Sequence, residues 1–231
     1  MMEQKRRRDD REKGFIFIVS APSGTGKTTL CRKVVEELPN LRFSVSHTTR
    51  FPRANELEGE DYYFITPNVF QEMVKRNEFL EWAEVLGNRY GTARSHVEDL
   101  IAEGVDLILD IDTQGAKKVQ EKMDEVVLIY LLPPSMEALK ERLVNRGLDS
   151  FDMIQFRLAH AKRDLEEAYW YQYVIVNEKI EDAAEKLKAI IIAEKCRRNK
   201  NSILDGKIKE LEENRGKNYS GRLSKKGGEP V

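Results

Sequence analysis

Cysteine is scarce in this chain of 231 residues, which contains only Cys31 and Cys196. Two cysteines without metal-ligand spacing exclude a disulfide scaffold and predict reduced structural thiols. Long apolar runs are also missing, because no stretch approaches the roughly 18 consecutive residues that a membrane-spanning helix needs. The charged residues 1–13 lack the apolar core of a signal peptide. We therefore expect a cytoplasmic protein that does not bind membranes.

A surplus of either charge is missing as well. The chain has 39 Lys and Arg against 40 Asp and Glu, which gives a net charge of -1. Binding to a nucleic-acid backbone requires an excess of basic residues on some face, so no nucleic-acid partner is expected. The hydrophobic fraction of 40% suffices for a sizeable core, and the length predicts one domain, or one domain with a modest insert. The oligomeric state stays open between monomer and homo-oligomer.

Short β-branched runs alternate along the chain with longer amphipathic segments. This alternation predicts an α/β fold in which helices flank a mostly parallel sheet. The predicted strands are 15–20, 105–111, 127–132 and 173–176. The predicted helices are 27–38, 94–103, 114–122, 135–146, 152–169 and 180–199.

The segment 41–92 departs from this rhythm, because it is richer in aromatic and polar residues. It breaks into short apolar pieces such as 62–65 and 79–86. We interpret it as an insert of short strands within a single domain, 14–200. The core of that domain is then formed by residues 14–40 and 93–200.

Both ends of the chain have a different composition from this domain. Residues 1–13 form a charged extension, and residues 201–231 form a basic tail that we expect to be partly disordered. In the tail, helical spacing of apolar residues predicts a short helix through Ile203, Leu204, Ile208 and Leu211.

A glycine-rich loop follows the first predicted strand and precedes the first predicted helix. Residues 20–30 read Ser-Ala-Pro-Ser-Gly-Thr-Gly-Lys-Thr-Thr-Leu. In a phosphate loop of this kind, backbone N–H groups face phosphate oxygens, Lys27 reaches the terminal phosphates and Thr28 ligates Mg²⁺. The candidate phosphate-binding residues are Ala21, Pro22, Ser23, Gly24, Thr25, Gly26, Lys27, Thr28 and Thr29.

Ala21 occupies the position of the first glycine in the usual form of this motif. The replacement matters only if the position requires a positive φ angle. The alternative interpretation of the loop is an ordinary glycine-rich turn between a strand and a helix.

Further motifs follow the loop in a fixed order. They are Ser-His-Thr-Thr-Arg-Phe-Pro-Arg at 46–53, Glu56, Gly59, Asp61, Tyr62, Phe64, Glu-Trp at 81–82, Gly-Asn-Arg-Tyr-Gly-Thr at 87–92 and Leu-Asp-Ile-Asp-Thr-Gln-Gly at 109–115. In order and spacing they closely resemble guanylate kinase, from about residue 15 to residue 193.

This resemblance implies a phosphate-loop NTPase core with a GMP-binding insert at 41–92 and a helical lid at about 143–165. It also implies a kinase of purine nucleotide metabolism that transfers the γ-phosphoryl group of ATP to GMP, and to dGMP. ATP and GMP are then the expected substrates, and Mg²⁺ accompanies ATP. Two alternatives remain: a non-catalytic protein-interaction module, and a kinase for another monophosphate such as IMP or AMP.

Guanine presents two hydrogen-bond donors, N1–H and the 2-amino group, so a pocket for it requires acceptors such as carboxylates. The resemblance assigns Glu81 and Asp112 to that role, and Ser46 and Thr92 to hydroxyl contacts with the base. Asp110 is also expected in the GMP site, and it is a candidate to hold Mg²⁺ through water. The sequence does not choose between these two roles of Asp110.

The phosphate of GMP is dianionic, which suits planar Arg groups and phenolic hydroxyls. By resemblance, the residues expected to bind it are Arg50, Arg53, Tyr62 and Tyr90. Asn177 corresponds to a position near the adenine of ATP and is expected to contact that nucleotide.

Two arginines of the expected lid, Arg146 and Arg157, are candidates for stabilising the charge of the transferred phosphoryl group. Together with Lys27 and Arg50, they form the expected catalytic set. Arg142, on the same predicted helix as Arg146, is a further candidate for this role, and its alternative role is a solvated cation on a charged helix face.

Overall fold

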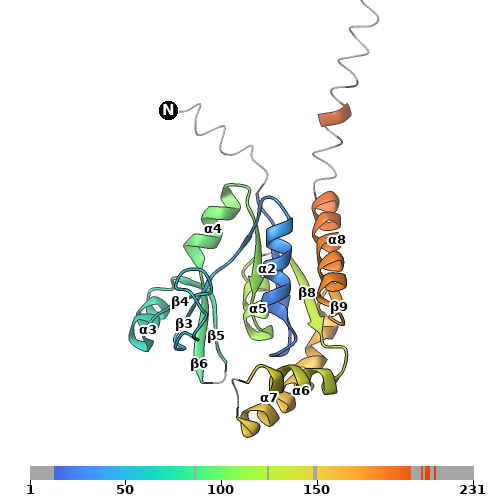
Figure 1. Ribbon diagram of the computed structural model, residues 1–231. Coiled ribbons are helices and arrows are strands. Elements are labelled where there is room, and N and C mark those ends of the chain that lie inside the picture. The colour runs from blue at the N-terminus through green and yellow to red at the C-terminus, as the bar shows by residue number, and fades with distance from the viewer. Residues whose placement is uncertain are drawn as a thin grey trace, which may run out of the picture. The chain divides into compact units, whose positions relative to one another are not determined.

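The structure is a computed structural model that describes residues 13–85, 87–123, 125–147, 150–198, 204, 206–208 and 211. The chain divides into two compact units, Met1–Ala189 and Ile190–Val231. The first unit contains two separate sheets, one of five strands and one of four (Figure 1).

The five-stranded sheet is parallel throughout and has the order β2-β7-β1-β8-β9. Its strands are β1 (Ile16–Ser20), β2 (Leu41–Phe43), β7 (Asp106–Asp110), β8 (Val126–Leu132) and β9 (Tyr173–Val176). β1, β7 and β8 are buried on both faces, which explains their continuous apolar sequences. The predicted α/β class with a parallel sheet is therefore confirmed, together with the four strands predicted from the apolar runs.

β1 lies in the middle of this sheet, between β7 and β8. From β1 the chain passes to β2 on one side of the sheet, whereas β7 is followed by β8 on the other side. The direction of strand order thus reverses beside β1. Open parallel sheets bind ligands outside the carboxyl ends of their strands at such a switch point. The loop after β1 occupies this position.

Helices pack their apolar residues against this sheet. α4 (Arg94–Ala102) and α5 (Thr113–Gln120) contribute Val97 and Val119 to the same buried cluster as Ile18, Leu109 and Leu128. α2 (Lys27–Glu37) buries Leu30, Cys31 and Val34. Because the buried positions of α2 recur at helical spacing, the sequence alone predicted this helix to within a residue.

The four-stranded sheet has the order β4-β3-β6-β5. Its strands are β3 (Ser46–Thr48), β4 (Tyr62–Phe64), β5 (Phe79–Val85) and β6 (Asn88–Ala93). β3 pairs with β4 in parallel, whereas β6 is antiparallel to both β3 and β5. These short strands fall in the segment 41–92 that the sequence analysis set apart from the core.

Two features of this segment differ from expectation. β2, at its start, belongs to the five-stranded sheet, where Leu41 lies beside Asp106 of β7. A helix, α3 (Pro67–Lys75), lies between β4 and β5, where only strands were expected. The signal for α3 was present in the sequence, because Thr66 caps the helix by accepting a hydrogen bond from the Val69 N–H at 3.3 Å, and proline follows it at the first helical position.

A smaller helical group follows β8. It consists of α6 (Met136–Asn145), α7 (Phe151–Asp164) and a 3-10 helix, Leu165–Trp170. Ser135 and Ser150 cap α6 and α7, and Leu139, Leu143, Ile154 and Ala161 form a separate buried cluster between them. The single predicted helix 152–169 is therefore divided, with its last turns in 3-10 geometry.

α8 (Ile180–Arg198) begins in the first unit and ends in the second. In the second unit, Leu204, Ile208 and Leu211 are helical and roughly half exposed. Ile203 of the predicted tail helix lies outside the described residues, as do residues 1–12 and 212–231. Among the described residues, every helix is too short or too polar to cross a lipid bilayer.

Leu128 is fully buried in the centre of β8, so Leu128→Ala should leave a cavity in the core. The free energy of unfolding is expected to fall by about 2–5 kcal/mol, measured by urea denaturation. Val144→Ala, at a position on α6 that is 52% exposed, serves as the control and should change this value by less than about 1 kcal/mol. Equal losses in the two variants would contradict the proposed core.

Candidate active site

The phosphate loop joins β1 to the amino terminus of α2 at the switch point of the sheet. Gly24 and Gly26 have φ angles of 92° and 93°, a conformation that L side chains rarely adopt. Asn40 and Asn77 are the only non-glycine residues with positive φ in the described parts of the chain, so Ala21 has an ordinary backbone conformation. The replacement of the first glycine by Ala21 therefore causes no backbone strain.

Asp110, at the carboxyl end of β7, connects the side chains that follow this loop. Its carboxylate forms an ion pair with Lys27 Nζ and accepts a hydrogen bond from Thr28 Oγ1. Lys27 Nζ also donates to the backbone carbonyl of Ile111 at 3.0 Å. The Asp110 side chain is only 8% exposed, which leaves its charge poorly screened by water.

Thr28 and Asp110 offer the hard oxygen atoms that Mg²⁺ prefers. Within the described residues, no cluster of three or more His, Cys, Asp or Glu side chains could hold a metal by itself. Mg²⁺ usually binds through one or two protein groups together with substrate phosphates and water.

Two side chains from outside the phosphate loop contact its backbone, Arg142 of α6 and Asn177 directly after β9. Asn177 Nδ2 donates to the Thr25 carbonyl at 2.8 Å, and Arg142 Nη1 donates to the same oxygen at 3.1 Å. Arg142 Nη2 also donates to the Asn177 carbonyl at 2.9 Å. Arg142 is thus anchored at the phosphate loop, which corrects its alternative role as a solvated surface cation. Asn177 Oδ1 is buried and has no hydrogen-bond partner among the described residues.

The carboxylates of Glu81 on β5 and of Asp112 at the amino terminus of α5 both lie close to Gly115. Together with Thr92 and Ser46 they form the group of residues that we call the carboxylate pocket. Glu81 is only 4% exposed, and its Oε1 accepts a hydrogen bond from Thr92 Oγ1 at 2.6 Å. Asp112 caps α5 by accepting a hydrogen bond from the Gly115 N–H at 2.8 Å. Ser46, on β3 of the same sheet, is 8% exposed.

Burial raises the pKa of Glu81 from 4.5 to about 7. The hydrogen bond from Thr92 and the positive charge of Lys118 oppose this rise, whereas the negative charge of Asp112 adds to it. The pocket therefore holds a carboxyl group that changes its charge near neutral pH.

The four residues expected to bind a nucleotide phosphate also lie together. Arg50 forms a two-point ion pair with Glu56, at 2.9 and 2.8 Å, and its guanidinium lies 5.3 Å from the ring centre of Tyr62. Arg53 Nη1 is 3.6 Å from the same Glu56 carboxylate. The rings of Tyr62 and Tyr90 meet edge to face at 5.9 Å. Glu56 thus orients both arginines.

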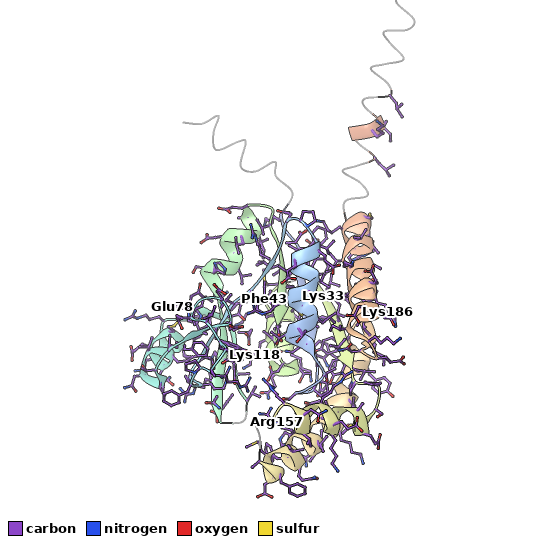
Figure 2. All side chains as sticks on the ribbon, in the orientation of Figure 1. Lys33, Phe43, Glu78, Lys118, Arg157 and Lys186 are labelled. Atoms are coloured by element: carbon purple, nitrogen blue, oxygen red, sulfur yellow. The ribbon has the colours of Figure 1, made fainter. Side chains whose placement is uncertain are left out.

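The phosphate loop and the carboxylate pocket are neighbours. Lys27 of the loop contacts Ile111, and the next residue, Asp112, belongs to the pocket. Burial raises the pKa of Tyr62, and the negative charge of Asp110 raises it further, so the phenol lies within electrostatic range of the loop. Lys118 of α5 reaches the Trp82 carbonyl of β5 at 2.5 Å and joins the core to the four-stranded sheet (Figure 2).

The two arginines of the expected lid have different positions. Arg157 of α7 is directed at the phosphate loop, where its Nη1 donates to Ser23 Oγ at 2.5 Å (Figure 2). Arg146 is the carboxyl-terminal cap of α6 and is exposed. Each candidate site residue thus lies in one of four places: the phosphate loop with its neighbouring side chains, the carboxylate pocket, the group Arg50, Arg53, Tyr62 and Tyr90, or the helical group α6–α7.

Sequence reasoning did not assign a role to Glu56 or Arg32. Glu56 was noted as part of a motif, yet only the structure shows its contacts with Arg50 and Arg53. Arg32 of α2 forms an ion pair with Asp61 at 2.8 Å and donates to the Glu60 carbonyl at 2.8 Å. The helical spacing places Arg32 on a face of α2, but no local pattern indicates its distant partner.

The parallel core, the phosphate loop and the adjacent carboxylate pocket together define a phosphate-loop nucleotide kinase. A family model for guanylate kinase matches residues 13–194. The chain is 49% identical to a guanylate kinase of Geobacter metallireducens over 81% of this chain and 92% of that protein. It is 50% identical to a guanylate kinase of Geobacter sulfurreducens, with the same two shares covered.

Solved structures show the same relationship. The crystal structure of guanylate kinase from Anaplasma phagocytophilum is 39% identical in sequence and superimposes with a TM-score of 0.67. The match covers 80% of this chain and 87% of that one. The chain therefore belongs to the guanylate kinase family, which comprises ATP:GMP phosphotransferases.

The raised pKa of Glu81 predicts that its contribution to stability depends on pH. Because the fold favours the protonated form, this contribution is complete below about pH 4.5 and is lost as the pH rises through about 7. Between pH 5 and pH 8, Glu81 should lower the free energy of unfolding by roughly 3 kcal/mol, and Glu81→Gln should remove this part of the pH dependence. Urea denaturation at both pH values measures this difference.

Glu84→Gln on the same strand is the matched control, because Glu84 is exposed. It should keep the pH dependence of the unmodified protein. An unchanged slope in Glu81→Gln would show that Glu81 is ionised throughout this range.

Proposed function

We propose that this protein transfers the γ-phosphoryl group of MgATP to GMP, and to dGMP, and so produces ADP and GDP. The observation that carries the proposal is the pair of adjacent sites: a phosphate loop next to a buried carboxylate pocket, with Lys27 contacting the residue before Asp112. The balanced charge of the chain supports small nucleotides rather than nucleic acid as its partners. We also propose a cytoplasmic location for the protein.

GMP is recognised by Glu81 and Asp112, which accept hydrogen bonds from N1–H and the 2-amino group of guanine. The hydroxyl groups of Ser46 and Thr92 supply further contacts with the base. Adenine offers an acceptor at N1 and lacks the 2-amino group, so it would leave a buried carboxylate without a donor. Sites built in this way can discriminate between bases by ~10⁴ or more.

The phosphate of GMP binds to Arg50, Arg53, Tyr62 and Tyr90. Glu56 already holds both arginines in position, so little side-chain entropy is lost when the phosphate binds. In this arrangement the acceptor oxygen of GMP faces the phosphate loop. This alignment is a major source of rate acceleration for a reaction between two bound substrates.

ATP binds with its phosphates in the loop 21–29. Lys27 contacts the terminal phosphates, Thr28 and Asp110 hold the Mg²⁺ that accompanies ATP, and the buried Asn177 Oδ1 is an acceptor suited to the adenine amino group. When bound, Mg²⁺ neutralises charge on the phosphates.

In the transfer step, a GMP phosphate oxygen forms a bond to the γ-phosphorus as the bond to the β–γ bridging oxygen of ATP breaks. The acceptor oxygen is already anionic, so a general base is not required. Lys27, Arg146 and Arg157 stabilise the charge on the transferred group and on the leaving ADP. Arg157 already contacts Ser23 of the loop, within reach of this position.

The proposal is tested by measuring ADP release with GMP, with AMP and with no acceptor. The kcat/KM for GMP should be at least ~10³-fold higher than that for AMP. ADP release without any acceptor should be slower than with either nucleotide. A preference for AMP or IMP would identify a different nucleotide kinase. Failure to bind ATP would favour a non-catalytic interaction module.

Lys27→Met should lower kcat with GMP by at least ~100-fold, because a cation at the terminal phosphates is lost. Lys33→Met is the matched control, since Lys33 lies on the same helix and pairs with Glu37 at 3.6 Å on the surface. It should keep nearly full turnover. Near-normal kcat in Lys27→Met, with the circular dichroism spectrum unchanged in both variants, would remove Lys27 from the mechanism.

Binding of GMP should depend on pH, because the ionised carboxylate of Glu81 accepts a hydrogen bond from guanine better than its protonated form does. With the pKa of Glu81 at about 7 in the free protein, the affinity for GMP should be roughly 4-fold lower at pH 6.5 than at pH 8. Calorimetric titration between pH 6.5 and 8 measures this trend. Glu81→Gln should abolish both the trend and the preference for GMP over AMP, and an unchanged preference would refute the assignment of Glu81.

A further inference from the structure

Gly115 is the third residue of α5 and is buried. Its φ angle is not in the left-handed region, since it is absent from the glycines with positive φ. Alanine could adopt the same backbone conformation and is a better helix former. Neither the backbone nor helix stability therefore accounts for glycine at this position.

The surroundings of Gly115 supply a reason. A Cβ atom placed on this residue would lie 2.6 Å from Glu81 Oε2 and 3.1 Å from Glu81 Cδ. It would also lie 3.3 Å from Asp112 Oδ1. The first distance is shorter than a carbon atom can approach an oxygen atom without displacing it, and the other two are tighter than most such contacts. The missing side chain of Gly115 is the space that the Glu81 carboxylate occupies.

Glu81 has little freedom to move away. Its other oxygen is held by Thr92 Oγ1 at 2.6 Å. The backbone on both sides of it is fixed to α5 and the turn that follows, because Lys118 donates to the Trp82 carbonyl at 2.5 Å and Lys122 donates to the Leu80 carbonyl. Displacement of the carboxylate would therefore break its hydrogen bond with Thr92 and move the Glu81 oxygen atoms that are proposed to accept hydrogen bonds from guanine.

We propose that Gly115 is a positioning residue for base specificity, which leaves room for Glu81 between α5 and β5 and so sets where guanine finds its acceptor. The inference rests on the proposed recognition of GMP. Gly115 also fixes the second carboxylate, since its N–H donates to Asp112 at 2.8 Å. One residue thus determines the separation of the two acceptors.

The experiment compares Gly115→Ala with the unmodified protein in steady-state kinetics with GMP and with AMP. Gly115→Ala should lower kcat/KM for GMP by at least ~30-fold and change that for AMP by less than ~3-fold, because only guanine depends on the position of Glu81. The KM for ATP should not change. Gly206→Ala, where a Cβ meets nothing within 4 Å, is the matched control and should leave every value unaltered.

A second variant tests the steric cause. Glu81→Asp withdraws the carboxylate by one methylene group, so the double variant Glu81→Asp/Gly115→Ala should lose less than the product of the two single losses. If Gly115→Ala does not fold, recovery of folding in the double variant supports the inference. Absence of that recovery overturns it.

The kinetic outcomes also separate this inference from the proposed function. If the unmodified protein does not prefer GMP, the proposed function itself fails. If it prefers GMP and Gly115→Ala keeps the same ratio of GMP to AMP, the role of Gly115 is refuted. Equal losses with both nucleotides would refute it as well, because they indicate general damage to the active site.

Discussion

The contact between Asp110 and Lys27 is the interaction on which the rest of the site depends. It joins the end of β7 to the loop after β1, and Thr28 binds the same carboxylate. Two nucleotides that both carry several negative charges repel each other, so a site that holds them side by side must place cations between them. In the proposed reaction, Lys27, which contacts Asp110 and the carbonyl of Ile111, is the cation at that boundary.

In the proposed recognition of GMP, selectivity comes from the burial of Glu81, which has a cost in stability. A carboxylate removed from water and next to Asp112 favours its protonated form, as the rise in its pKa shows. A ligand that supplies hydrogen-bond donors reverses this preference, and a ligand without them does not. Discrimination thus arises from the penalty for a buried, unsatisfied charge more than from the strength of any single contact.

The fold could be predicted from the sequence where the signal is local. Continuous apolar runs identified the core strands, and residues 20–30 identified the phosphate loop without any knowledge of the remaining chain. The helix α3 was missed because a short aromatic-rich segment suggested strands, although Thr66 and Pro67 marked a helix start. The ends of the elements shifted by a few residues for the usual reason that caps and fraying decide them.

The site was only partly predictable, because its decisive contacts join residues far apart in the chain. Motif spacing selected Glu81, Asp112 and Arg50 as candidates, and their functional roles remain predictions. Nothing in the spacing indicated that Glu56 orients Arg50, or that Gly115 makes space for Glu81. Such relationships depend on the register between β5 and β6 and on the packing of α5 against β5, which one sequence does not specify.

The ion pair between Arg32 and Asp61 attaches the turn before Tyr62 to the helix that follows the phosphate loop. Its two side chains are 37% and 26% exposed, so water and dissolved ions reach both charges. An attachment of this kind contributes at most about 1 kcal/mol and weakens as the salt concentration rises. The ionic strength of the surroundings therefore changes how strongly the turn before Tyr62 is held to α2.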